Sequence, residues 1–270
     1  MFGAIVGDII GSKFEFKNTS EKDFPLFSET SKFTDDTILT CATAEKLLFS
    51  TNYQDTYRRY SVIYANSGFG GGFKKWVASK NPVPYNSYGN GSAMRVSPVG
   101  WAFDKQEDVL EEAKRSAEVT HSHPEGIKGA QAIALAIFLA RQGKSKKDIT
   151  FEVGVECDYD FSLTVDAIPR KFDVSCQGTI PICFAVFNET DNFEDAIRTA
   201  ISLGGDSDTN AAIVGSIAEA FYGEIPIAMV EEAKTRLPFL LRYITDYFYR
   251  RYNKDKHSIY FPEENTTEQT

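Results

Sequence analysis

The sequence is poor in histidine and has no paired cysteines. Its 270 residues include three histidines and four cysteines. The cysteines form no CxxC pair and lie in or beside apolar stretches; they are Cys41, Cys157, Cys176 and Cys183. This pattern favours free thiols in a reduced setting. We therefore expect a cytoplasmic protein.

Long apolar runs and excess positive charge are also missing. No run approaches the ~20 apolar residues of a membrane-spanning helix. Residues 1–10 are apolar, but they lack a basic leading segment and contain Asp8, unlike a secretory signal peptide. The formal net charge of −9 repels nucleic acid and anionic membranes. We expect neither as a partner, although local donors and cations could still hold a small phosphate ligand.

Strand-like alternation is scarce; the candidates are residues 151–155 and 161–165, and both also fit a helix or a connection. Apolar residues at steps of three and four are frequent instead and predict helices. These helices are expected over residues 37–49, 106–118, 124–143, 192–202, 208–222, 226–236 and 238–252. We predict an all-α single domain over residues 1–262 and a disordered polar tail over 263–270. Residues 11–32 and 67–97 are expected to be long functional loops.

Two acidic motifs stand far apart in the chain. Asp35 and Asp36 are adjacent, whereas Asp206 and Asp208 occupy alternate positions. Either motif alone fits a helix N-cap. If the motifs converge, however, their carboxylates repel one another unless cations lie between them. An oxygen-only ligand set suits Mg²⁺ or Mn²⁺ better than zinc.

Two glycine-rich patterns accompany the acidic motifs. Residues 87–92 have too little side chain for a core and no Lys-Ser/Thr ending, so they are not a P-loop. Their backbone N–H groups suit a phosphate, although a simple turn fits the spacing equally well. Gly3, Gly7 and Gly11 recur at helical spacing and predict close helix packing, with Asp8 supporting the acidic motifs.

The motifs together resemble the ADP-ribosylglycohydrolases, which include the dinitrogenase reductase-activating glycohydrolases. They occur in family order from residue 3 to about residue 225. The matching stretches are residues 3–8 with 11–12 and 14–15, 34–37, 88–95, 120–124 and 204–209. The resemblance implies a compact orthogonal helical bundle with a central dimetal site.

The resemblance also implies roles for individual residues. Two Mg²⁺ or Mn²⁺ ions would be held by Thr34, Asp35, Asp36, Asp206, Asp208 and Thr209. Glu15 would carry acid/base chemistry beside the ribose, and Asp35 and Asp36 would take part in catalysis. ADP-ribose would contact Gly70, Ser87, Tyr88, Gly89, Asn90, Gly91, Ser92, Met94 and His121. Arg95 is either a phosphate contact or a buried partner of an acidic residue, and His123 is unassigned.

The implied function is hydrolysis of the bond between ADP-ribose and an attached group. That group could be a protein Arg or Ser side chain, a small-molecule adduct or another ADP-ribose unit. We expect a monomer whose partner is the ADP-ribosylated substrate. Two alternatives stay open: a two-metal phosphohydrolase, and a non-catalytic relative that only binds ADP-ribose.

Overall fold

Helices dominate the computed structural model, which describes residues 1–262. The expected tail at 263–270 lies outside the described residues. Between residues 1 and 262 the backbone forms no β-strand, and its isolated β-bridge joins Gly89 to Ser175. The all-α prediction is therefore confirmed. The helices are α1 (Phe2–Gly11), α2 (Asp35–Phe49), α3 (Tyr53–Ile63), α4 (Gly71–Ala78), α5 (Gly91–Met94), α6 (Ser97–Ala102), α7 (Gln106–Glu118), α8 (Pro124–Arg141), α9 (Lys146–Cys157), the 3₁₀-helix η1 (Val165–Ala167), α10 (Cys176–Glu189), α11 (Phe193–Ser202), α12 (Ser207–Tyr222), α13 (Ile227–Thr235), α14 (Phe239–Tyr252) and α15 (Lys254–Tyr260).

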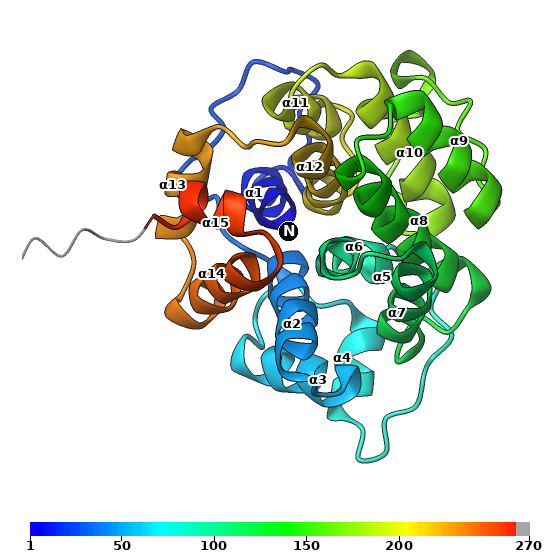
Figure 1. Ribbon diagram of the computed structural model, residues 1–270, viewed down its shortest axis with the longest axis vertical. Coiled ribbons are helices and arrows are strands. Elements are labelled where there is room, and N and C mark those ends of the chain that lie inside the picture. Colours follow the sequence, from blue (N-terminus) through cyan, green and yellow to red (C-terminus); the bar gives the residue numbers. More distant parts are fainter. Residues whose placement is uncertain (263–270) are drawn as a thin grey trace, which may run out of the picture.

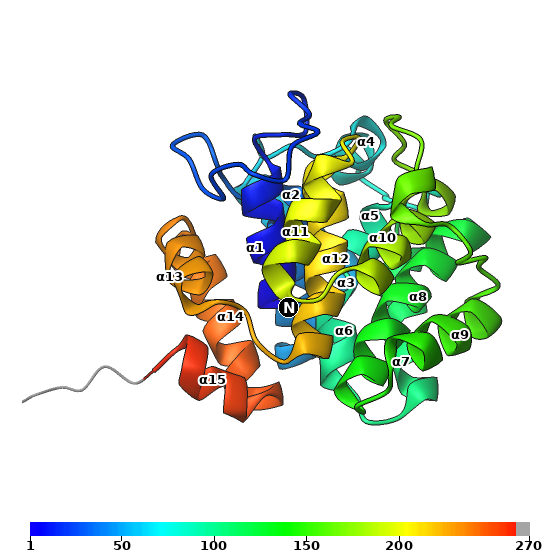
Figure 2. The same cartoon turned by 90° about the horizontal axis from the view of Figure 1, so that it is seen from above.

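Helices α1 and α12 lie side by side at the centre, surrounded by the other helices (Figures 1 and 2). Every residue of α1 is buried. Glycines make the contact with α12 close: a Cβ on Gly3 would lie 2.2 Å from the Gly215 carbonyl oxygen, and one on Gly7 2.1 Å from that of Ala211. The close packing predicted from the spacing of Gly3, Gly7 and Gly11 is observed, and it fixes the ends of both helices relative to each other.

A buried carboxylate ties α1, α12 and α14 together. Glu219 of α12 accepts hydrogen bonds from the Met1 ammonium group at 2.6 Å and from the Gly3 N–H at 2.8 Å. The Tyr249 hydroxyl of α14 donates to the same carboxylate and accepts from the Phe2 N–H. Burying the charge is tolerable because the carboxylate has an ionic partner and several donors.

The functional motifs lie at one end of this core. Helix α1 ends there, and α2 and α12 begin there. The first acidic motif lies at the start of α2, and the second lies at the start of α12. Figure 2 shows the segment after α1, helix α4 and the segment before α10 gathered at this end. The partial positive charge of two helix N-termini stabilises acidic side chains at this position.

The local structure settles two open segments and corrects one prediction. Residues 151–155 lie inside α9, and 161–165 form no strand, so the helix and connection alternatives hold for them. The expected loop at 67–97 contains helices α4 and α5. Helix α4 forms despite its glycines because Phe73 and Trp76, three residues apart, are both buried. None of the described helices has the length and apolar character needed to cross a bilayer.

Candidate active site

Carboxylates from three helices and one connecting segment converge at the end of the core. Oxygen atoms of Asp8, Asp36 and Asp208 lie within 4.8 Å of one another, and so do those of Glu15, Asp206 and Asp208. The convergence expected of the two acidic motifs is therefore present, although 173 residues separate Asp36 from Thr209, whose hydroxyl donates to it at 3.3 Å.

Asp8 organises this cluster from α1. Its Oδ1 accepts the Thr34 hydroxyl at 2.7 Å, and its Oδ2 accepts the backbone N–H groups of Thr34 at 2.9 Å and Thr37 at 3.1 Å. The Thr37 hydroxyl donates to the same oxygen. Because these donors occupy both oxygens, Asp8 fixes the first turn of α2 and leaves cation binding to the other carboxylates.

Two buried oxygens in the cluster lack a donor. Oδ1 of Asp36 and Oδ1 of Asp208 have no hydrogen-bond partner among residues 1–262. Buried carboxylate oxygens normally accept hydrogen bonds or bind cations. The donor set of carboxylates and Thr hydroxyls is the kind that Mg²⁺ and Mn²⁺ prefer. The site therefore fits divalent cations.

The electrostatics point the same way. Burial is the main cause that raises the pKa of Asp36 and of Asp208; the next cause is the charge of Asp208 for Asp36 and the charge of Asp206 for Asp208. Burial and the nearby Asp8 raise the pKa of Asp35 to about 7. The pKa of Glu15 is raised by burial and then by Asp206. Without cations, the protein holds mutually repelling carboxyl groups; cations would favour their ionised forms.

The cluster forms one wall of a cleft of about 380 Å³. A second wall is the glycine-rich segment of residues 87–91, which leads into α5. The two walls are joined because the Asn90 amide donates to Asp206 Oδ2 at 2.7 Å. Asn90 is also held from behind, since its backbone N–H donates to the Val174 carbonyl at 2.7 Å.

Comparison with known proteins decides the family. The family model described as ADP-ribosylglycohydrolase matches residues 1–255. The chain belongs to this family. The predicted class of enzyme, a glycosidic-bond hydrolase, is thereby confirmed.

The relatives of this glycohydrolase agree with that assignment. It is similar to "ADP-ribosylhydrolase ARH3" of Mus musculus, at 29% identity covering 82% of each chain. The ARH3 protein of Bos taurus is also 29% identical, over 82% of this chain and 83% of the relative. A solved structure titled "ADP-ribosylglycohydrolase-related protein complex" matches with a TM-score of 0.72 and 23% identity, covering 92% of this chain and 95% of the other. That structure supports the fold.

Most residues that the sequence singled out line the glycohydrolase cleft. They are Glu15, Asp35, Asp36, Gly70, Ser87, Gly89, Asn90, Gly91, Met94, His121, Asp206, Asp208 and Thr209. Thr34 lies just behind them, bonded to Asp8. Ser92 does not line the cleft; it is fully buried and donates to the Gly126 carbonyl at 2.6 Å. Tyr88 is also outside the lining and packs edge-on against His123.

Arg95 and His121 both line the cleft, although each side chain is almost entirely buried. Arg95 is fully buried, but its partners are the Ser116 carbonyl and the Thr120 hydroxyl. The predicted acidic partner is therefore wrong for the described residues, in which no carboxylate forms an ion pair with Arg95. Burial, and secondarily the Arg95 charge, lower the pKa of His121 well below its usual value. This shift favours the neutral imidazole.

Asn18 is a site residue that the sequence did not indicate. Its amide donates to the Phe14 carbonyl at 2.6 Å and the Gly205 carbonyl at 3.1 Å, and its oxygen accepts the Gly205 N–H at 3.0 Å. Asn18 thus joins the segment that carries Glu15 to the second acidic motif. The partners are 187 residues apart, so local sequence gives no signal for this contact.

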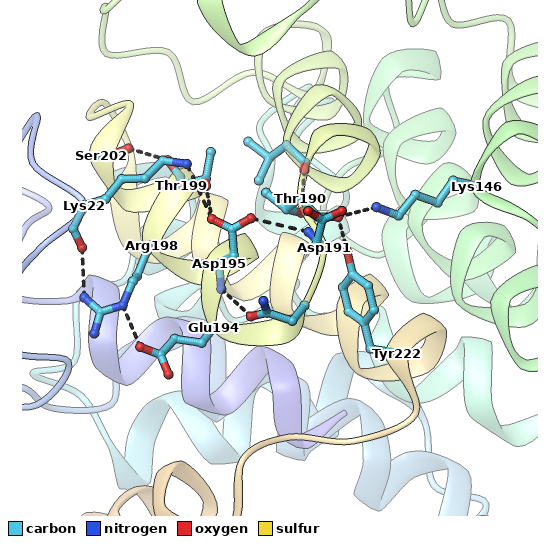
Figure 3. A network of polar contacts seen from close by, with 12 residues as sticks. Lys22, Lys146, Thr190, Asp191, Glu194, Asp195, Arg198, Thr199, Ser202 and Tyr222 are labelled. Atoms are coloured by element: carbon cyan, nitrogen blue, oxygen red, sulfur yellow. Dashed lines mark hydrogen bonds and ion pairs between the residues drawn. The ribbon is translucent and has the colours of Figure 1, made fainter.

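The same segment is fastened at its far side. Arg198 of α11 donates to the carbonyls of Lys22 and Phe24, each at 2.8 Å. Figure 3 shows Arg198 reaching the Lys22 carbonyl beside the pair of Lys22 with Asp195. Other cleft residues that were not predicted include Leu39, Phe73, Tyr85, Phe172 and Val174.

Proposed function

We propose that this chain hydrolyses the glycosidic bond between ADP-ribose and an attached group with the help of two divalent cations. The observation that best supports this proposal is the Asn90–Asp206 hydrogen bond, which joins the glycine-rich segment to the acidic cluster in one cleft. A ligand with a ribose at the cluster and a diphosphate at the glycines matches both walls. The names of the ARH3 relatives support the same chemistry.

The proposed cation ligands are the members of the two acidic motifs. Asp36 and Asp208 each supply an oxygen without a donor, and Asp35, Asp206, Thr34 and Thr209 complete the set. When bound, the cations would orient the ribose hydroxyls and lower the pKa of bound water. Asp8 keeps Thr34 and Thr37 in place for this arrangement.

Glu15 is the proposed acid/base group. Its carboxylate lies at the edge of the cluster, beside Asp206 and Asp208. Breaking the bond at the anomeric carbon builds positive charge on the ribose, which a neighbouring carboxylate stabilises. The same carboxylate can accept the proton of the attacking water. Its raised pKa brings it nearer to the working pH.

The glycine-rich segment is the proposed diphosphate site. Ser87, Gly89 and Gly91 line the cleft with little side-chain bulk, so phosphate oxygens can approach the backbone N–H groups. Met94 and Gly70 lie on the same cleft surface.

All four cysteines are buried and free. We therefore propose that the enzyme works in a reducing compartment, the cytoplasm. We also propose that it works as a monomer.

A product assay tests the reaction. The enzyme is incubated with Mg²⁺ and peptides ADP-ribosylated on Arg or on Ser, and both products are identified by mass spectrometry. Glycosidic hydrolysis adds the water hydroxyl to the anomeric carbon and a proton to the acceptor, so intact ADP-ribose and an unmodified peptide are expected. Release of AMP, with phosphoribose left on the peptide, would instead establish a phosphohydrolase. An unchanged adduct that still binds would establish a non-catalytic protein.

A further inference from the structure

Arg95 is a buried positive charge without a negative partner in the described chain. Its side chain is fully buried, and its guanidinium lies 4.3 Å from the centre of the Tyr57 ring. One nitrogen, Nη2, donates to the Ser116 carbonyl at 2.8 Å and the Thr120 hydroxyl at 2.9 Å. Nε and Nη1 have no hydrogen-bond partner among residues 1–262. A buried charge in this state is costly unless something nearby balances it.

The Thr120 hydroxyl lies between Arg95 and His121 and contacts both. Thr120 Oγ1 lies 2.7 Å from His121 Nδ1. Oγ1 already accepts from the Arg95 guanidinium, which has donors only. Thr120 is fully buried, so its single proton needs an acceptor, and Nδ1 is the acceptor in reach. Thr120 therefore donates to Nδ1, and the neutral imidazole carries its proton on Nε2.

Nε2 points towards the glycine-rich wall of the cleft. It lies 3.1 Å from the position that a Cβ on Gly91 would occupy, and 3.7 Å from the equivalent position on Gly89. No described residue forms a hydrogen bond with Nε2, while His121 lines the cleft. We call the contacts from Arg95 through Thr120 to His121 the relay. The relay presents one N–H donor to a ligand bound against these glycines, and the Arg95 charge lies at its other end.

We propose that Arg95 and Thr120 are positioning residues that hold His121 as an Nε2–H donor and thereby give the cleft its preference for a diphosphate. This inference rests on the proposed function, because it assigns the anion at the glycine-rich wall to the diphosphate of ADP-ribose. The ligand's negative charge balances Arg95, and its oxygen accepts from Nε2. An uncharged ligand would leave the Arg95 charge unbalanced and would accept a weaker hydrogen bond.

The test variant is Thr120→Val, which keeps the side-chain shape and removes the hydroxyl. We expect ADP-ribose and ADP to bind about tenfold more weakly in calorimetry, as for loss of a hydrogen bond to a charged group. Mg²⁺ affinity should not change, because other residues form the cation site. Thr120→Ser keeps the hydroxyl and should bind like the wild type. Thr190→Val is the matched control, since Thr190 is equally buried but donates within its own helix, to the Val186 carbonyl.

Nitrogen-15 NMR of the imidazoles tests the tautomer directly. The chain has three histidines, so the spectrum is simple. His123 is an internal reference, because its Nδ1 accepts the Glu125 N–H at 3.1 Å and Nε2 must carry its proton. The wild-type protein should show His121 as the neutral Nε2–H form, and Thr120→Val should add the Nδ1–H form while His123 stays unchanged.

Several results would overturn the relay. These are a wild-type His121 that is protonated or carries its proton on Nδ1, an unchanged ADP-ribose affinity in Thr120→Val, or an equal loss of Mg²⁺ affinity. If Thr120→Val does not fold, Thr120→Ala takes its place in both measurements. Neither measurement needs turnover, so a wild-type protein that binds ADP-ribose without cleaving its adducts would refute the proposed function and leave the relay standing.

Discussion

Two buried oxygens without a donor distinguish the acidic cluster from a pair of helix caps. Thr34 does cap α2, since its hydroxyl accepts the Asp36 N–H. Asp206 occupies the same position before α12 but makes no capping hydrogen bond, and its Oδ2 instead accepts from Asn90. The capping interpretation of the first motif is therefore correct as far as it goes. It leaves Oδ1 of Asp36 and of Asp208 unexplained, and cation binding explains both.

Replacing Glu15 by Gln should separate chemistry from binding. The amide keeps the size of the side chain but cannot accept the proton of water, so turnover should fall about 100-fold or more. ADP-ribose should bind as before, because the proposed role of Glu15 lies in the reaction. Kinetics and calorimetry on one preparation measure the two effects.

Glu21→Gln is the control for this substitution, because Glu21 is an exposed residue of the same segment. Its turnover should match that of the wild type. Near-normal turnover in Glu15→Gln would return Glu15 to the status of an ordinary surface carboxylate.

Among the structural elements, the segment between α1 and α2 depends on contacts with distant parts of the chain. Arg198 holds Lys22 and Phe24, and Arg236 donates to the carbonyls of Ser28 at 2.8 Å and Ser31 at 2.7 Å. Among residues 1–262, the hydrogen bonds that link its Glu15 end to the second acidic motif come from Asn18. The position of Glu15 should therefore be sensitive to Asn18 in particular.

Asn18→Ala should lower kcat about tenfold, as expected for the loss of roughly one net hydrogen bond that holds the acid/base group. The KM value should change less, because Asn18 does not line the cleft. Asn81→Ala, at an exposed Asn, is the control. A fall in thermal stability without any change in kcat would show that the contact serves the fold alone.

The contact between α1 and α12 is the second element that places the site. A methyl group on Gly7 would lie 2.1 Å from the Ala211 carbonyl oxygen, so Gly7→Ala must separate the two helices. Overpacking of this kind costs about 1–3 kcal/mol of unfolding free energy, occasionally more. Urea unfolding should show this loss. Gly71→Ala is the control, because a Cβ there meets nothing within 4 Å; an equal loss in both variants would contradict the packing argument.

At the scale of the whole molecule, the sequence predicted what depends on local pattern and on contiguous motifs. The long helices follow from apolar periodicity, and the convergence of the acidic motifs was expected because shared cations would offset the mutual repulsion of their carboxylates. The sequence left residues 151–155 open between strand and helix, because Phe151, Val153 and Val155 alternate like a strand, whereas α9 buries Ile149, Val153 and Cys157. Helix α4 was missed because its glycines conceal the buried pair Phe73 and Trp76.

The contacts that complete the site could not be predicted for a different reason. Asn18 meets Gly205, and Thr120 meets both Arg95 and His121, through side chains whose orientation depends on the finished fold. No local propensity encodes such pairs. The single domain over 1–262 and the individual site roles stay predictions, and the variants above test those roles.

Stability of the whole molecule should depend jointly on pH and Mg²⁺. In EDTA, Asp35 ionises in the folded protein at a pKa of about 7, raised from its ordinary 3.8, and Asp36 and Asp208 are shifted in the same direction. Between these pH values the unfolded chain has released protons that the folded chain still holds, so this contribution makes stability fall as pH rises. Mg²⁺ binds the ionised carboxylates and stabilises the folded state by mass action.

The difference in melting temperature between Mg²⁺ and EDTA should therefore widen from pH 5 to pH 8, and it should shrink in Asp36→Asn and Asp208→Asn. A difference independent of pH, or unchanged in both variants, would place the Mg²⁺ site elsewhere in the protein.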